Sequence, residues 1–220
     1  MGKDTSVLKV ALLTFATIFI MGYINGYALN TPQLGMLVTP QTGNVIQFGL
    51  NTANGNFLAL SKNIALFLGF VGGVIFALLT QNIFNNKIMQ FFYNWSCFAL
   101  PYALYPVYGE FVGSHIGLLV LAFASGAGLG FFRKIFHLDI NNAMATGNVR
   151  MLGVWFGEAY VKKARTEKQE VFTFMIFLIC VLLFAGGAFC FAVANKLGMK
   201  NVMLVVFCLA PYILAPTKSE

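Results

Sequence analysis

The chain has 220 residues, of which 59% are hydrophobic and only 10% are charged, and its mean hydropathy is +0.78. These values exclude an ordinary soluble domain and indicate an integral membrane protein, in which lipid covers the apolar surface. The net charge of +7 needs no nucleic-acid partner. Basic residues gather in short segments between apolar runs, where the positive-inside rule places them on the cytoplasmic side.

Apolar runs long enough to cross a hydrocarbon core of ~30 Å predict six membrane spans. In chain order they are Val7–Leu29, Phe57–Phe84, Ile88–Tyr108, Ser114–Phe132, Val171–Ala194 and Asn201–Ala215. The first span contains Gly22 and Gly26, a pair of small residues that permits close helix approach. It also contains the amide of Asn25, for which we favour a hydrogen bond to another helix slightly over a contact with a substrate.

A broken element follows the first span. Pro32, Gly35 and Pro40 interrupt the helix, and Thr42-Gly43-Asn44 opens a new one that reaches about Leu50. A helix from Gly43 to Leu50 would cover roughly 12 Å, which is less than half the hydrocarbon core. We therefore expect this element to dip into the membrane and not to cross it.

The same motif returns 104 residues later as Thr146-Gly147-Asn148, and its helical run continues to about Tyr160. Other landmarks recur in the same order: Gly22 and Gly26 as Gly126 and Gly130, Gly72-Gly73 as Gly186-Gly187, and Pro101-Tyr102 as Pro211-Tyr212. Four markers in one order indicate an internal duplication. The chain is then a single membrane domain, 1–220, with one repeat over 7–108 and the other over 114–216.

The charge distribution selects the topology of the two repeats. If each Thr-Gly-Asn element is re-entrant, each half has three spans and the halves are inverted; if it crosses, each half has four spans and the halves are parallel. With the N-terminus inside, the first arrangement puts ten Lys and Arg inside and three outside, and the second puts eight inside and five outside. The positive-inside rule favours the first. The predicted fold class is an all-α membrane protein with six transmembrane helices as two inverted three-helix repeats, each with a re-entrant broken helix, and with both termini cytoplasmic.

Two half-helix ends that meet from opposite faces would form a polar site at the midplane, because helix N-termini present free N–H groups and partial positive charge. Nine candidate substrate-binding residues follow: Asn25, Thr42, Gly43, Asn44, Gln47, Thr146, Gly147, Asn148 and Arg150. Two alternatives stay open. The Thr and Asn residues can serve only as helix caps, and Arg150 can pair with Glu158 instead of an anionic substrate.

The sequence contains no set of nucleophile, base and orienting group, and no nucleotide-binding loop. We therefore expect no enzyme, no catalytic residue, no cofactor and no metal, with the four cysteines acting as small apolar residues. Two functions remain open: a transporter or channel for a small polar solute, and a non-transporting subunit that captures a substrate or regulates a partner protein. The expected partners are the lipid bilayer, the solute, and a second copy or a partner subunit, with no nucleic acid.

The pattern resembles the YoaK-like family of small bacterial membrane proteins of unknown function, also called DUF1275. The residues that carry the resemblance are Gly22-Tyr23-Ile24-Asn25-Gly26, Val38-Thr39-Pro40-Gln41-Thr42-Gly43-Asn44 and Ala143-Met144-Ala145-Thr146-Gly147-Asn148. It covers nearly the whole chain and implies a multi-pass protein of the bacterial inner (cytoplasmic) membrane. The chain departs from the family pattern at Asn25, where members often have an acid.

Overall fold

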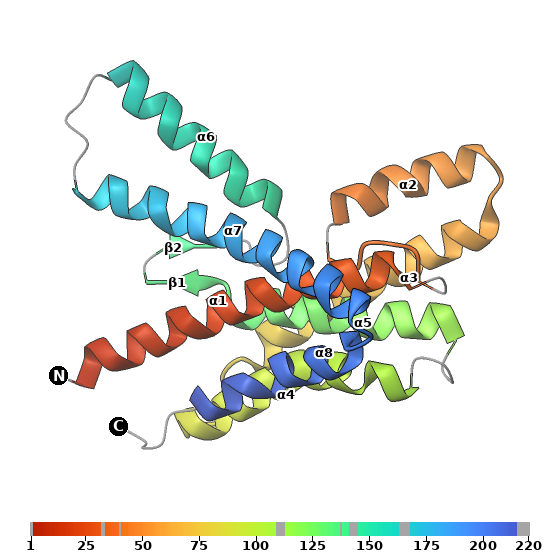
Figure 1. Ribbon diagram of the computed structural model, residues 1–220, viewed down its shortest axis with the longest axis horizontal. Helices are drawn as coiled ribbons and strands as arrows, with labels where there is room; N and C mark the ends of the chain where they lie inside the picture. The colour runs from red at the N-terminus through yellow and green to blue at the C-terminus, as the bar shows by residue number, and fades with distance from the viewer. Residues whose placement is uncertain are drawn as a thin grey trace.

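The structure is a computed structural model that describes residues 2–31, 34–39, 41–108, 113–136, 138–140, 145–162 and 168–214 (Figure 1). The described chain is almost entirely helical. Its helices are α1 (Gly2–Leu29), α2 (Gln41–Ala53), α3 (Phe57–Thr80), α4 (Lys87–Tyr108), α5 (Gly113–Phe131), α6 (Ala145–Lys162), α7 (Lys168–Lys196) and α8 (Lys200–Leu209). A 3₁₀ helix, η1 (Ala210–Leu214), continues α8, and the strands β1 (Lys134–Ile135) and β2 (Leu138–Asp139) form a small antiparallel hairpin.

The six apolar runs that the sequence predicts as spans all form helices, and apart from the C-terminal end of the last one their ends lie within five residues of the predicted ones. The last run differs, because the α-helix stops at Leu209 and the chain tightens into η1 around Pro211, which has no N–H to donate. The first Thr-Gly-Asn helix is longer than predicted and ends at Ala53, just before Gly55 at a φ of +65°. Gly35 also has a positive φ, of 60°, whereas Pro32 and Pro40 lie outside the described residues.

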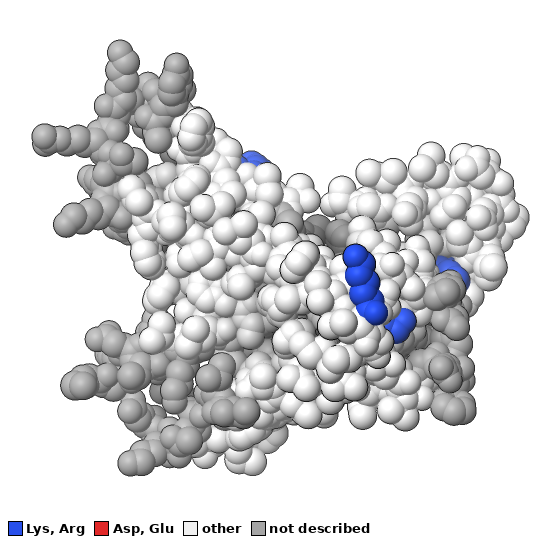
Figure 2. All heavy atoms as spheres, in the orientation of Figure 1, with Lys and Arg blue, Asp and Glu red and all other residues white. Residues whose placement is uncertain are grey.

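Three helices are long and apolar enough to cross a membrane by length and composition: Val10–Leu29, Phe57–Thr80 and Val171–Lys196. Two shorter apolar helices cover His115–Phe131 and Lys200–Tyr212. Large apolar side chains are exposed along the outward faces of most helices, and Figure 2 shows a face with only a few basic groups among uncharged residues. A surface of this kind needs lipid to cover it, so the structure indicates a helical membrane protein.

Glycines hold two pairs of helices in close contact. A Cβ on Gly22 of α1 would collide with the carbonyl oxygen of Phe184 in α7, and one on Gly187 would collide with that of Phe19. In the second pair, a Cβ on Gly126 of α5 would collide with the carbonyl oxygen of Phe70 in α3, and one on Gly73 with that of Phe123. The sequence prediction that Gly22 permits close helix approach is confirmed, with α7 as the partner helix.

Each of these pairs takes one helix from the first half of the chain and one from the second half. The short helices then complete two bodies: α6 packs on α7 beside α1, and α2 packs on α3 beside α5. We call α1, α6 and α7 the first body, and α5, α2 and α3 the second body. In Figure 1, α1 and α7 run in one direction, whereas α5 and α3 run in the opposite direction.

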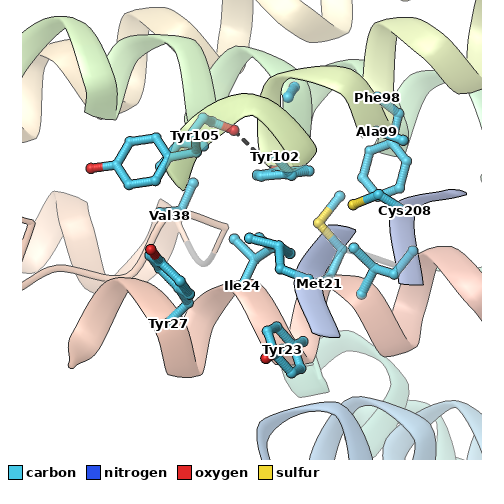
Figure 3. Packing of buried hydrophobic residues seen from close by; sticks show 14 of the residues in the cluster. Met21, Tyr23, Ile24, Tyr27, Val38, Phe98, Ala99, Tyr102, Tyr105 and Cys208 are labelled. Atoms are coloured by element: carbon cyan, nitrogen blue, oxygen red, sulfur yellow. Dashed lines mark hydrogen bonds between the residues drawn. The ribbon is translucent and has the colours of Figure 1, made fainter. Parts of the chain in front are cut away.

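Aromatic and aliphatic side chains fill the space between the two bodies and the helices α4 and α8. Figure 3 shows Tyr27 and Ile24 of α1 pointing toward Tyr105 and Tyr102 of α4, and the ring centroids of Tyr27 and Tyr105 are 6.0 Å apart. The indole of Trp95 in α4 donates to the carbonyl oxygen of Cys208 in α8 at 2.9 Å. This core joins the two bodies through side chains, in contrast to the backbone contacts made at the glycines.

Candidate functional site

The segment before α2 is held by the amide of Asn25. Its Nδ2 donates to the carbonyl oxygen of Met21 at 2.8 Å and to Oγ1 of Thr39 at 2.6 Å. Its Oδ1 accepts the backbone N–H groups of Val38 at 3.2 Å and Thr39 at 3.3 Å. The amide therefore uses its full hydrogen-bonding capacity inside the chain, and it bonds a loop where the sequence suggested another helix.

Asn44 holds the same segment from the other side. Its Nδ2 donates to the carbonyl oxygen of Leu37 at 3.1 Å and, at 3.5 Å, to Oε1 of Gln41. The side chain therefore acts as a donor to the loop, where helix capping would use it as an acceptor of N–H groups. Asn25 and Asn44 together fix residues 37–39 and so set where α2 begins.

The second motif places its asparagine in a similar way. Asn44 is 3% exposed and Asn148 is 2% exposed, and each is the fourth residue of its helix. The threonines of both motifs are exposed, and both glycines are half-buried. A Cβ on Gly43 would meet no atom within 4 Å, so helix packing does not account for glycine at this position.

The remaining two candidates lie further along their helices. Gln47 and Arg150 are both exposed. The alternative partner of Arg150 is Glu158, whose side chain the structure does not describe. The structure thus gives Asn25 an internal role and places the Thr-Gly-Asn residues at the starts of α2 and α6, with Gln47 and Arg150 further along, without assembling all nine around one point.

The two Thr-Gly-Asn helices start in the middle of the molecule and run outward in opposite directions (Figure 1). On the face seen in Figure 2, a hollow separates the lobe of α6 and α7 from the lobe of α2 and α3. In the described part of the chain, α2 packs mainly on α3 and α6 packs mainly on α7. Between α2 and α6 there is no extensive packing among these residues. The two helix starts therefore border a hollow and do not form a tight contact with each other.

A cavity of about 240 Å³ lies between α2 and α3. Two asparagines and five apolar residues line it: Asn44, Asn63, Val45, Phe48, Ile64, Phe67 and Leu68. Both asparagines are buried, whereas the five apolar residues are 41–58% exposed. The cavity is therefore lined almost entirely by apolar atoms, and its apolar walls continue to the surface of the molecule.

Asn63 is the polar residue lining this cavity that the sequence prediction missed. It is 2% exposed, and neither its Nδ2 nor its Oδ1 has a hydrogen-bond partner. Leaving a buried amide unpaired costs about 1–3 kcal/mol of stability, so such a group calls for an explanation. The signal in the sequence was an amide inside the apolar span after Lys62, but only the fold shows that it is buried beside α2.

Polar groups at the ends of α3 and α5 are paired with each other. Oγ of Ser61 and Nε2 of His115 are 2.7 Å apart. All four cysteines are free thiols, and the described residues contain no cluster of His, Cys, Asp and Glu that could hold a metal ion. Among the described residues, the buried side chain whose polar atoms have no hydrogen-bond partner is Asn63.

Comparison with known proteins identifies a family. The model of the family described as "Protein of unknown function (DUF1275)" matches residues 13–215, so the chain belongs to this family. The comparisons with curated proteins and with solved structures give no match.

Proposed function

We propose that this member of DUF1275, a family of unknown function, is a membrane transporter or channel for a small polar solute. The solute would bind at the hollow between the starts of α2 and α6. The observation that carries the proposal is the pair of short helices, each with a buried asparagine in its first turn, that run from the middle of the molecule in opposite directions. Transporters commonly bind substrates at such half-helix ends.

The proposal includes six transmembrane helices: α1, α3, α4, α5, α7 and the continuous unit of α8 and η1. α2 has 13 residues and would cover roughly 20 Å, too little for the ~30 Å hydrocarbon core. α2 and α6 are then re-entrant elements that dip from opposite faces. Both termini lie in the cytoplasm of a bacterial cell in this arrangement, which also gives the larger excess of basic residues inside.

An inverted repeat is supported by the glycine contacts. Gly22 meets Phe184 and Gly126 meets Phe70, and these four positions are related by the same offsets as the repeats in the sequence. The contacts of Gly187 with Phe19 and of Gly73 with Phe123 correspond in the same manner. Corresponding helices run in opposite directions in Figure 1, as an inverted duplication requires.

The chemistry of the proposed site follows from the helix starts. The first N–H groups of an α-helix have no intrahelical acceptor and carry partial positive charge. They can therefore donate to the oxygen of a neutral or anionic solute, and Gly43 leaves room for its approach, since nothing lies within 4 Å of the place of a Cβ. The exposed Thr42 and Thr146 hydroxyls add a donor and acceptor on each side.

A flux assay tests this function. Protein reconstituted in liposomes is mixed with glycerol, urea or nitrate, and the swelling rate is followed by stopped-flow light scattering. We expect at least one solute to enter at least tenfold faster than in empty liposomes. The double variant Asn44→Ala with Asn148→Ala should lose this excess while eluting as the wild type does, and the exposed Asn195→Ala should keep it.

The second candidate function is a non-transporting subunit that works with a partner protein. The same preparation separates the two candidates. Wild-type flux that the double variant leaves unchanged would contradict the proposed site. Swelling equal to that of empty liposomes for every solute, together with a partner that copurifies in a fixed ratio, would favour the subunit.

A further inference from the structure

We infer that the cavity between α2 and α3 holds part of an acyl chain of a membrane phospholipid, which lies between the two helices. The inference does not depend on transport, because it concerns one pair of helices and not the hollow between the two bodies. It rests on the apolar lining of the cavity and on its depth along a helix that is long and apolar enough to span the membrane.

The depth of the cavity identifies the phase that borders it. Ile64, Phe67 and Leu68 of α3 line it, and they stand in the middle part of the span Phe57–Thr80. Leu68 lies roughly 16 Å from the start of this helix, at 1.5 Å per residue, which places it inside a hydrocarbon core of ~30 Å. At that depth the bilayer consists of acyl chains, whereas headgroups and water lie nearer to the helix ends. The molecules that reach the mouth of the cavity are therefore lipid tails.

The walls of the cavity suit a hydrocarbon chain. Five of the seven lining residues have apolar, partly exposed side chains: Val45, Phe48, Ile64, Phe67 and Leu68. The other two offer an occupant little polarity. The Nδ2 of Asn44 is bonded to the carbonyl oxygen of Leu37, and both polar atoms of the Asn63 amide are buried away from the surface.

Neither water nor empty space suits this cavity. A buried water molecule needs two to four polar partners, and a space of about 240 Å³ would hold several such molecules between apolar walls. If the space were empty, the side chains around it would lose dispersion contacts on that side. A hydrocarbon chain restores these contacts and needs no polar partner.

The volume fits a part of one acyl chain. An apolar cavity of ~150 Å³ accepts benzene with its six carbon atoms, so about 240 Å³ has room for roughly nine carbons by proportion. The remainder of the chain and the headgroup then stay in the bilayer. The apolar walls continue to the surface, so the chain can enter sideways without breaking a polar contact.

The other half of the chain fills the corresponding place with its own side chains. Under the offset of 104 residues, Phe48 of α2 corresponds to Leu152 of α6. Leu152 and its neighbour Met151 pack against a buried apolar cluster that α1 and α7 share, whereas Phe48 lines the cavity. A short helix of this kind can therefore pack on its long partner without a gap, and the gap is particular to α2 and α3.

A lipid with a photoreactive tail tests the inference. Full-length protein is reconstituted in liposomes of phosphatidylethanolamine and phosphatidylglycerol, with a trace of a phosphatidylcholine that carries a diazirine in the middle of one acyl chain. After illumination, the adducts are mapped by digestion and mass spectrometry. Residues around Leu182 of α7 serve as the reference, because Leu182 is 61% exposed, Leu68 is 58% exposed, and both lie near the middle of their spans. We expect at least fivefold more adduct on residues 64–68 than on residues 180–184.

Two variants of α2 separate the cavity from ordinary contact with lipid. Val45→Trp fills the cavity from an exposed position and should reduce the adduct on residues 64–68 to the level found around Leu182. Ile46→Trp, at an exposed position of α2 that does not line the cavity, should keep the wild-type excess. If Val45→Trp does not fold, the smaller change Val45→Phe should lower the excess at least twofold.

Three results overturn the inference. Equal labelling of residues 64–68 and 180–184 in the wild type would mean that lipid tails touch α3 only as they touch any exposed helix. Absence of adduct on residues 64–68 would mean that tails do not enter the cavity. An excess that survives in the folded Val45 variant would place the bound chain outside the cavity. None of these results depends on solute flux, so a failure here leaves the proposed transport function to its own assay.

Discussion

Three buried asparagines of this protein differ in how their amides are satisfied. Asn25 makes four hydrogen bonds within the chain, Asn44 donates to the loop and borders the α2–α3 cavity, and Asn63 makes none. In an apolar interior each missing hydrogen bond costs more free energy, because no water molecule is present to replace the absent partner. Removing the amide should therefore have opposite effects on stability at Asn25 and at Asn63.

Replacing Asn25 should destabilise the protein. In Asn25→Ala the backbone N–H groups of Val38 and Thr39 lose their acceptor, and each buried donor left unpaired costs about 1–3 kcal/mol. The midpoint of SDS-induced unfolding should fall accordingly. Asn195→Ala, at an exposed position, serves as the control and should leave the midpoint unchanged. A midpoint for Asn25→Ala equal to the wild type would contradict the role of this amide.

Replacing Asn63 should have the reverse effect. Asn63→Leu removes two unpaired polar atoms and roughly keeps the volume of the side chain. The free energy of unfolding should therefore stay the same or rise, by about 1–3 kcal/mol at most. The same unfolding assay measures it in the absence of added ligand. A clear loss of stability would show that the Asn63 amide has a partner in the protein as it exists in the membrane.

The sequence predicted part of this residue-level picture. It predicted that the amide of Asn25 is hydrogen-bonded inside the protein, but it suggested another helix as the partner and not the loop that follows the same helix. The amide of Asn63 was visible in the sequence, but its burial was not, because an amide within an apolar run can face a helix, a loop or the membrane interface. Only the residues that surround the amide in the folded structure decide which of these it faces.

At the scale of the helices, adjacent glycines have different roles. In α7 a Cβ on Gly187 would collide with the backbone of α1, whereas one on Gly186 would only touch the edge of the Phe19 ring at 3.9 Å. In α3 the same holds for Gly73 and Gly72, with 3.7 Å between the Gly72 Cβ position and Phe123. The sequence alone does not distinguish the two glycines of each pair, because it does not show which one faces the partner helix.

This difference gives a matched pair of variants. Gly187→Ala should separate α1 from α7 and lower stability by at least about 1 kcal/mol. Gly186→Ala should be tolerated, and it should gain up to about 0.5–1 kcal/mol from the better helix propensity of alanine. Unfolding midpoints of the two variants, measured side by side, check this. Equal loss of stability in both would contradict the packing of α1 on α7.

At the scale of the whole molecule, each body combines helices from both halves of the chain. α1 finds its close partner in α7, and α5 finds its close partner in α3. The sequence predicted the helix positions, because apolar runs and the residues that break them are local signals. It did not reveal the exchange of helices between halves, because repeat spacing carries no information on which copy packs with which.

The exchange predicts how fragments behave. A chain cut between α4 and α5 should yield two fragments that copurify when expressed together, since each body needs both. Either fragment expressed alone should lack a close partner for its glycine-bearing helices and should aggregate in detergent. Size-exclusion chromatography distinguishes these outcomes. A monodisperse product from one fragment alone would mean that each half folds by itself.

We propose that α2 and α6 enter the membrane from opposite faces without crossing it. Two exposed turn residues report on this for α2: Asn54, which follows α2, and Asn82, which follows α3. Each is replaced by Cys in a cysteine-free background and labelled in intact spheroplasts with a maleimide that does not cross membranes. We predict that Asn54→Cys reacts from outside, and that Asn82→Cys reacts only after the inner face is opened. With the N-terminus in the cytoplasm, the reverse pattern would mean that α2 crosses the membrane, and it would contradict the inverted arrangement and the site built on it.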